Sequence, residues 1–357
     1  MFSKEKINTG RQVELDIARG LAVLFMIFIH AQLYFANKSV VNSSFGEFND
    51  FVGDMPAAPM FMFLLGVGMN YTRKNNPSLM FKRGIMLILI GYLLNLIRGF
   101  VPYTIRAYYS MDITYLYEGI TELLYVDILQ FSGLAMIMFG LFNQFNVKNF
   151  TIILTVIGLS VINVFMLNVP TDKWGLSAIT GLVWGSNENS YFPFLTWVFY
   201  PIAGFLFGSL LIRCTNKKKF YIRSAIIGAV IFFSGTYLFN VVFGIPTGLE
   251  SDIGYYHHFI TDNITFTGFI LLEISILSFL APLVPKFVQT IVARWSKNVT
   301  PIFCIHWVII TWATLIITPY SLNMFWFVLF LIVIVPLSDC VAYIYSNRKN
   351  RKIKQYI

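Results

Sequence analysis

The chain has 357 residues, of which 57% are hydrophobic and only 12% are charged. A soluble domain carries roughly 25% charged residues, so this composition excludes an ordinary soluble enzyme and predicts an integral membrane protein. The net charge of +9 would suit nucleic acid, but the positions of the cations argue against that partner.

Ten apolar runs are candidates for membrane-spanning helices, because crossing the hydrocarbon core takes about 20 residues. The second is short and begins next to Pro56 and Pro59. The predicted fold is therefore all-α, a single polytopic transmembrane domain over residues 1–357. In chain order the runs are 15–34, 57–71, 84–103, 125–142, 150–168, 193–212, 222–243, 264–284, 299–318 and 323–346.

Charge predicts the orientation of these runs. If both termini are cytoplasmic, nearly all of the 26 Lys and Arg residues fall on the inner side, the exceptions being Lys38, Arg98, Arg106 and Lys173. The positive-inside rule favours this topology. The net positive charge is then explained by the orientation of the chain and by attraction to anionic lipid. Most acidic residues fall in outer segments, which would repel a strongly anionic acceptor unless they are simply solvated.

Two outer segments, 104–124 and 169–192, are too long to be simple turns. Their Tyr, Trp, Asn and Ser residues would suit sugar binding, but an aromatic belt at the membrane surface is the alternative. The segment 286–298 is predicted to be a short amphipathic helix on the inner leaflet. The three cysteines form no pair that indicates a disulfide or a metal site, and no cleavage site follows the first run.

Arg19 and His30 mark the two ends of the first run. Eleven residues make about three helical turns, so both side chains share one face, about 16 Å apart along the axis. Arg19 would lie near cytoplasmic water, where it could hold a phosphate, and His30 would lie beyond the membrane midplane. The alternatives are an interfacial arginine paired with Asp16 and a hydrogen-bonded packing histidine.

Other ionisable residues inside predicted spans are also candidates for function. His306 is expected to make an interhelical bond, and Glu273 must be protonated or paired, with His30, His306 or Arg98 as partners. Asp339 could pair with a cation of the C-terminal tail. His257 and His258 form a metal site only with a third ligand, so no metal site is predicted.

The stretch ELDIARGLAVLFMIFIH resembles the first helix of the transmembrane acyltransferase superfamily. That group includes the acyltransferase-3 enzymes, with an arginine, ten residues and a histidine, and the heparan-α-glucosaminide N-acetyltransferase type. The stretches GDMPAAPMFMFLLGVGM and YFPFLTWVFYPIAGFLFGSLL, and a late IHW, are similar to the heparan type. Those enzymes place their catalytic histidine in the loop after the first helix, whereas residues 34–56 contain none. His30 therefore takes that role, or the chain belongs to a branch with a different activity.

The resemblance implies an enzyme that takes an acyl group, expected to be acetyl, from cytoplasmic acyl-CoA to an extracytoplasmic sugar hydroxyl or amine. His30 would be the general base and Asp54 would orient its ring. The CoA phosphates would be bound by cations on the inner side, namely Arg19, Lys82 and Arg83. Asn95 or His306 could donate to the developing oxyanion.

Two other functional classes fit parts of the sequence. Buried His and Glu also suit a proton-coupled small-molecule transporter, although the chain has no evident internal repeat. A non-catalytic membrane scaffold is the third reading. The expected location is a cell membrane, such as a bacterial plasma membrane. The acceptor, the acyl chain length and the oligomeric state, a homo-oligomer included, stay open.

Overall fold

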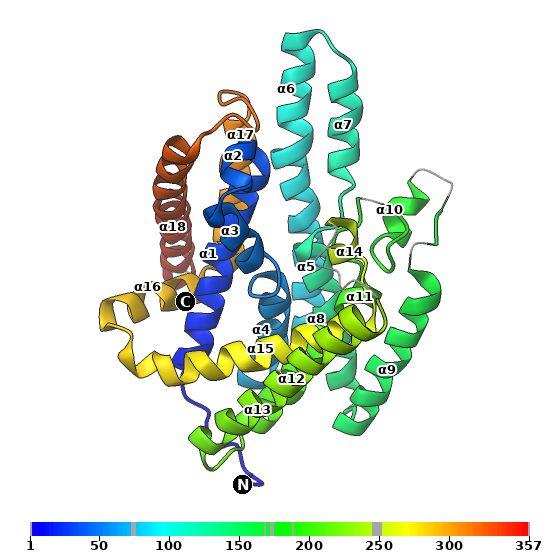
Figure 1. Cartoon of the computed structure of the whole chain (residues 1–357), viewed down its shortest axis with the longest axis vertical. Coiled ribbons are helices and arrows are strands. Elements are labelled where there is room, and N and C mark those ends of the chain that lie inside the picture. The colour runs from blue at the N-terminus through cyan, green and yellow to red at the C-terminus, as the bar shows by residue number, and fades with distance from the viewer. Residues whose placement is uncertain are drawn as a thin grey trace. The chain divides into compact units, whose positions relative to one another are not determined.

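The computed structural model describes residues 2–72, 76–167, 169–171, 175–187, 189–244 and 252–355. Within these ranges every regular element is a helix, and the only extended pairings are isolated bridges (Figure 1). The main helices are α1 (Val13–Phe35), α2 (Lys38–Val41), α3 (Ser44–Gly53), α4 (Ala58–Tyr71), α5 (Pro77–Asn95), α6 (Val101–Ser110), α7 (Thr114–Leu123), α8 (Ile128–Gln144), α9 (Asn149–Met166), α10 (Leu176–Thr180), α11 (Phe194–Trp197), α12 (Phe199–Leu211), α13 (Lys217–Thr236), α14 (Asp252–Tyr256), α15 (Ile260–Leu280), α16 (Lys286–Lys297), α17 (Val299–Ala313) and α18 (Met324–Gln355). Short elements of other helical type among the described residues are η1 (Leu96–Phe100), η2 (Tyr237–Val242) and η4 (Ala281–Leu283).

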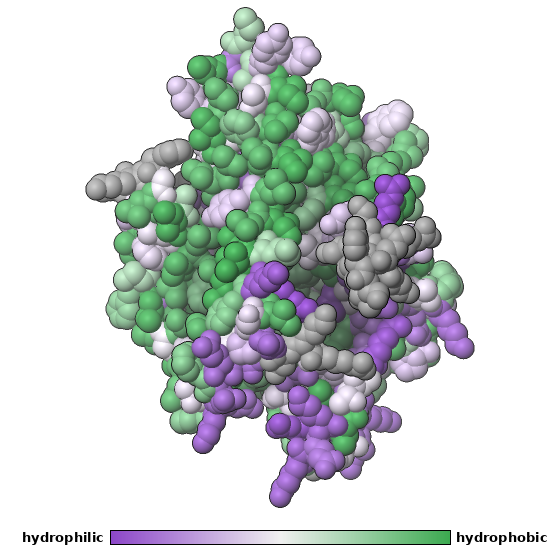
Figure 2. Space-filling view, turned by 180° about the vertical axis from the view of Figure 1, so that it is seen from behind, coloured by the Kyte–Doolittle hydropathy of each residue, from purple (hydrophilic) through white to green (hydrophobic). Residues whose placement is uncertain are grey.

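The all-helical prediction is confirmed, and a helix lies in each of the ten predicted runs. Among the described residues, 7 helical segments are long and apolar enough to cross a membrane. The helices α8 and α17 are apolar but shorter, and α1 is not among the seven. Ten crossings and two cytoplasmic termini therefore stay predictions. Figure 2 shows apolar side chains covering most of the face in view, as expected of a protein surrounded by lipid.

The segment 104–124 is more ordered than the sequence indicated. It contains most of α6 and all of α7, which form a helical hairpin instead of an irregular connection. Met111 makes the turn with a left-handed φ of 57°. The other long segment, 169–192, holds only the single turn of α10 among its described residues.

The chain forms two compact units, each assembled from three separate stretches. Unit 1 contains residues 1–11, 62–96 and 120–276, and unit 2 contains residues 12–61, 97–119 and 277–357. The long helix that starts at Pro77 passes from unit 1 into unit 2 within η1.

Glycines let helices of unit 1 approach one another closely, as is common in membrane proteins. A Cβ atom on Gly66 of α4 would lie 1.8 Å from the carbonyl oxygen of Pro201 on α12. In the reciprocal position, a Cβ on Gly204 would lie 1.9 Å from the carbonyl of Phe63. Beside α12, the N-terminal segment donates from its Ser3 amide to the carbonyl of Arg213 at 2.8 Å.

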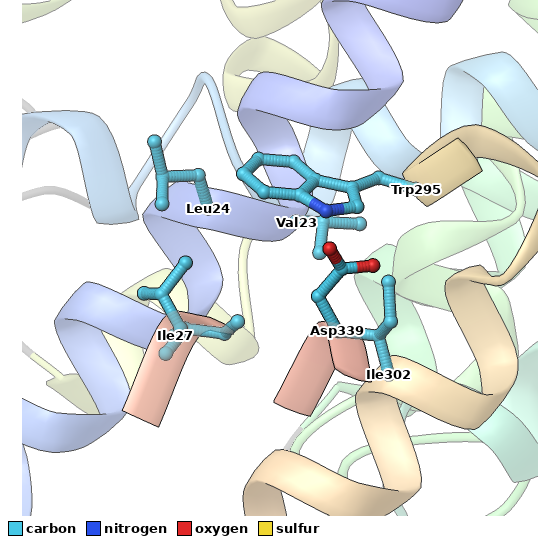
Figure 3. Close-up of a pocket in the computed structure, with 7 residues that line it drawn as sticks. Val23, Leu24, Ile27, Trp295, Ile302 and Asp339 are labelled. Atoms are coloured by element: carbon cyan, nitrogen blue, oxygen red, sulfur yellow. The ribbon is translucent and has the colours of Figure 1, made fainter. Parts of the chain in front are cut away.

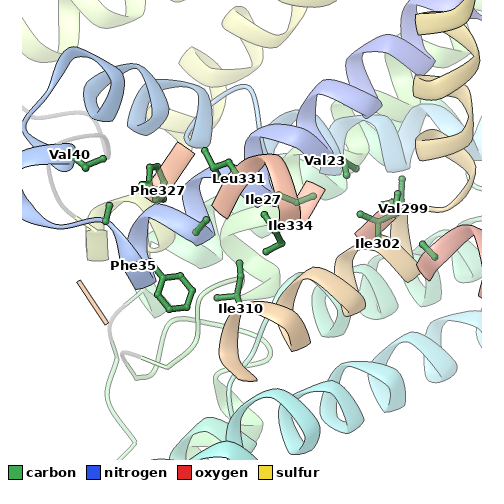
Figure 4. Packing of buried hydrophobic residues seen from close by; sticks show 13 residues of the cluster. Val23, Ile27, Phe35, Val40, Val299, Ile302, Ile310, Phe327, Leu331 and Ile334 are labelled. Atoms are coloured by element: carbon green, nitrogen blue, oxygen red, sulfur yellow. The ribbon is translucent and has the colours of Figure 1, made fainter. Parts of the chain in front are cut away.

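Unit 2 is built around α1, α17 and α18. Their apolar side chains interlock in one core cluster that includes Val23, Ile27, Ile302, Phe327 and Ile334 (Figure 4). The predicted amphipathic helix 286–298 is confirmed as α16, although its position at the inner leaflet stays a prediction. It packs on α1 where a Cβ on Gly20 would come within 2.9 Å of Val292 Cβ, so part of its apolar face contacts protein.

Candidate functional site

Arg19 and His30 lie on one uninterrupted helix, α1, as the sequence predicts. The residues that join them along the shared face are Val23 and Ile27, each only 2% exposed. Both are packed into the core of unit 2 against α17 and α18. The expected route along this face is therefore filled by side chains in this structure, and any passage of a ligand along it would require these helices to move apart.

His30 contacts a second histidine from α17. Its Nδ1 lies 2.9 Å from His306 Nε2, and the two rings are nearly parallel, 5.2 Å apart. The interhelical bond expected of His306 is thus present, and its partner is His30. His306 is fully buried, whereas His30 is partly exposed.

The hydrogen bonds fix the tautomers of the neutral pair. His306 Nδ1 lies 3.1 Å from the Ile302 carbonyl, which can only accept, so this nitrogen carries the proton. His306 Nε2 must then accept from the Nδ1–H of His30. His30 consequently presents an unprotonated Nε2, which is the form that a general base needs.

Aromatic and cationic groups surround this pair. The Trp307 ring stacks on His30 with centroids 4.1 Å apart, and the Arg98 guanidinium lies 4.3 Å above the Trp307 ring. Arg98 is carried by η1, a short π-helical element, and is 4% exposed. Such π-bulges occur often at functional sites.

Asp54, predicted to orient His30, ends α3. That helix is fastened to α1 by Gln32, which donates to Asp50 Oδ1 at 2.6 Å and accepts from Asn49 at 2.9 Å. Since the Nδ1 of His30 bonds to His306, a carboxylate could act only on the Nε2 side. That role would need the opposite tautomer of His30, so the role predicted for Asp54 competes with the His306 bond and stays a prediction.

At the other end of α1, Arg19 takes part in a polar relay. Its Nη1 donates to Ser296 Oγ at 2.9 Å, and Ser296 in turn donates to Asp16 Oδ1 at 2.6 Å. Arg19 thus connects to Asp16 through a serine of α16. Lys82 and Arg83 are exposed on α5, which belongs to unit 1, so their joint action with Arg19 stays a prediction.

A narrow crevice, with no room for a water molecule, lies beside the same stretch of α1 (Figure 3). Its wall is apolar except for Trp295 and Asp339, and the carboxylate and the indole face each other in the figure. Asp339 does not pair with a tail cation, as the sequence suggested, but with Arg294 of α16 through two hydrogen bonds. The lining residues are Val23, Leu24, Ile27, Trp295, Ile302, Val335 and Asp339.

Two further candidates lie in unit 1. Asn95 is buried and donates its amide to the carbonyls of Leu123 and Tyr125, at 3.3 and 2.7 Å, so this donor is already engaged. Glu273 Oε2, on α15, has no hydrogen-bond partner among the described residues. Its expected partners, His30, His306 and Arg98, belong to unit 2, and the pairing stays a prediction.

His257 and His258, which lie between α14 and α15, each bond to a backbone carbonyl. His257 Nε2 donates to the Ser190 carbonyl at 2.6 Å, and His258 Nδ1 donates to the Tyr255 carbonyl at 2.7 Å. Burial lowers the pKa of both imidazoles, although the bond to Ser190 opposes this for His257 and Asp262 opposes it for His258. Across the described ranges, no three His, Cys, Asp or Glu residues gather as a metal site would require.

Comparison with protein families finds one match over more than half of the chain. Residues 11–240 match the family model described as heparan-alpha-glucosaminide N-acetyltransferase, catalytic. The chain belongs to this family. It is therefore an integral membrane protein of an acetyltransferase family, as the resemblance of the first helix indicated. Among individually curated proteins, no significant match is found.

The matched region of this acetyltransferase family contains Arg19, His30 and Arg98, but it ends before His306 and Trp307. The sequence did not indicate that Trp307 contacts the site, and it suggested Arg98 only as a supporting residue and a partner for Glu273. The IHW triplet places a histidine next to a tryptophan, but it does not indicate which helix packs against these two side chains. That information requires the tertiary fold.

Proposed function

We propose that this protein transfers an acyl group, expected to be acetyl, from cytoplasmic acyl-CoA to a sugar hydroxyl or amine on the extracytoplasmic side of a cell membrane, such as a bacterial plasma membrane. The family membership supports the reaction class. The observation that carries the proposal is the His306–His30 hydrogen bond, because it leaves an imidazole nitrogen of a partly exposed residue free to accept a proton.

His30 acts as the general base. Its Nε2 takes the proton of the acceptor O–H or N–H while the oxygen or nitrogen attacks the thioester carbon. The bond from that carbon to sulfur then breaks, and the CoA thiolate leaves and takes the proton from the imidazolium. A positioned base of this kind contributes typically 10²–10⁴-fold to the rate.

His306 is a positioning residue. By accepting from His30 Nδ1–H, it fixes the orientation and the tautomer of the His30 ring. This hydrogen bond becomes stronger as positive charge develops on His30. This is the function that a buried carboxylate has in other acyl-transfer sites. The bond between the imidazoles needs one accepting nitrogen, so the pair holds at most one additional proton.

The donor is held by its phosphates at Arg19, and the assisting role of Lys82 and Arg83 stays a prediction from the sequence. Guanidinium groups suit phosphate because they donate two parallel hydrogen bonds. Arg19 already donates to Ser296, so phosphate binding would use its remaining N–H groups or replace that bond. Because Val23 and Ile27 fill the face between Arg19 and His30, the pantetheine arm would reach His30 only after α1 separates from α17 or α18.

Turnover in detergent tests the reaction class against a proton-coupled transporter. Purified protein in detergent, with acetyl-CoA and an amino sugar, is expected to release free CoA and to form acetylated sugar without any gradient. A transporter would do neither in detergent and would move substrate only in sealed vesicles under a proton gradient. No acetylated product, together with gradient-driven uptake, would reject the proposal.

A further inference from the structure

Arg98 is a buried cation, and burying its charge is energetically unfavourable. It lies on η1 with 4% of its surface exposed, inside a helical segment that is apolar enough to cross a membrane. A charged side chain at such a depth is costly, and intramembrane arginines usually mark functional sites. The general-base mechanism described above does not use it.

The guanidinium of Arg98 lies over the face of Trp307, 4.3 Å from the ring centroid. Trp307 also stacks on His30, at 4.1 Å and an angle of 30°. Trp307 is itself only 9% exposed, so water screens this contact little. The Arg98 guanidinium and the His30 imidazole thus both contact the same indole ring.

Local structure holds Arg98 in place. A π-helical turn widens the backbone, and the Ile97 carbonyl within it accepts from Trp312 Nε1 at 3.0 Å. Six residues beyond the end of η1, Arg106 donates to the Thr314 carbonyl at 2.8 Å. Both bonds fasten this segment to the end of α17, the helix that carries His306 and Trp307.

We propose that Arg98 is a positioning residue for the transfer reaction: it holds Trp307 against His30, and its charge keeps His30 in the neutral, basic form. The proposal rests on the proposed function, since it assigns His30 as the base. A second positive charge next to a guanidinium is electrostatically unfavourable, so Arg98 opposes protonation of His30 in the resting site. The same charge favours the negative charge that develops on the thioester oxygen in the transition state.

Other ionisable groups of unit 2 near His30 come from the helices packed around it. His306 on α17 bonds to it directly, and Arg98 on η1 acts through Trp307. On α3, Asp50 is engaged with Gln32, and Asp54 ends the helix. The two Arg98 variants described below leave these other groups in place.

The test is the pH dependence of kcat/KM in three purified variants. In Arg98→Gln, His30 becomes easier to protonate, so the acid limb should move to higher pH by roughly 0.5–1 unit, and kcat should fall about 10-fold or more. Arg98→Lys should keep the acid limb of the wild type. Lys38→Gln is the control, because it removes an exposed cation on α2 of the same unit that has no part in holding Arg98 or Trp307, and it should leave the limb unmoved.

An acid limb in folded Arg98→Gln that superimposes on the wild type would overturn the proposal. If Arg98→Gln does not fold, the proposal is tested with Trp307→Leu, because this variant removes the ring through which Arg98 acts. Its kcat should fall about 10-fold while the KM for acyl-CoA stays unchanged, and a wild-type kcat would overturn the proposal. Normal turnover in His30→Ala would instead reject the base assignment itself, so the two failures are distinguishable.

Discussion

Replacing Gly66 by alanine is expected to destabilise the protein. The added Cβ would lie 1.8 Å from the Pro201 carbonyl oxygen. Close carbon–oxygen contacts between helices lie at about 3.3 Å, so α4 and α12 must separate locally by roughly 1.5 Å. Overpacking of this kind lowers the free energy of unfolding by about 1–3 kcal/mol, and the higher helix propensity of alanine offsets about 1 kcal/mol of this loss.

Gly68 provides the matched control two residues further along the same helix. A Cβ there meets no atom within 4 Å. Thermal unfolding in detergent should therefore give a midpoint for Gly66→Ala several degrees below the wild type, and a midpoint for Gly68→Ala equal to the wild type or slightly above it. If the two variants were equally stable, the close approach of α4 and α12 would be refuted.

Three further predictions follow from single groups. Arg19→Ala should weaken acetyl-CoA binding about 10-fold or more in a protein that stays folded, measured by calorimetry with Lys286→Ala as the control; unchanged affinity would reject Arg19 as a phosphate ligand. Because burial lowers the pKa of His257, its stabilising contribution is present above the unfolded value of about 6.5 and is lost as the pH falls below it. The midpoint of thermal unfolding should then fall less between pH 8 and pH 5 in His257→Gln than in the wild type, and equal falls would contradict this reasoning. A single cysteine introduced at position 38 should be labelled from outside intact cells and one at position 218 only after permeabilisation; the reverse pattern would overturn the predicted topology.

Local patterns predicted the helices well. The predicted run 15–34 corresponds to α1, Val13–Phe35, and the predicted amphipathic stretch 286–298 corresponds to α16. In both cases the information lies within a few turns of chain, as apolar length in the first and a two-sided pattern in the second. The three-turn spacing of Arg19 and His30 is likewise a local property, and the structure places both on one continuous helix.

Contacts between distant parts of the chain could not be predicted in this way. His30 and His306 are 276 positions apart, and only the packing of α17 on α1 brings them together. Arg98 reaches Trp307 from a π-helical turn, for which no residue pattern is diagnostic. The sequence suggested that Asp339 could pair with a cation of the C-terminal tail, but in the structure it pairs with Arg294 of α16. Sequence reasoning therefore identified the ionisable groups but not which of them meet.

The rate of acyl transfer by His30→Ala tests the central claim most directly. Purified wild type, His30→Ala and His306→Ala are to be compared at saturating acetyl-CoA, with acetyl-CoA affinity measured on the same samples. We expect His30→Ala to lose about 10²–10⁴-fold in transfer rate with unchanged acetyl-CoA binding, and His306→Ala to lose less. Near-normal turnover in His30→Ala, with activity abolished in His306→Ala, would place the catalytic base on α17 and contradict this account.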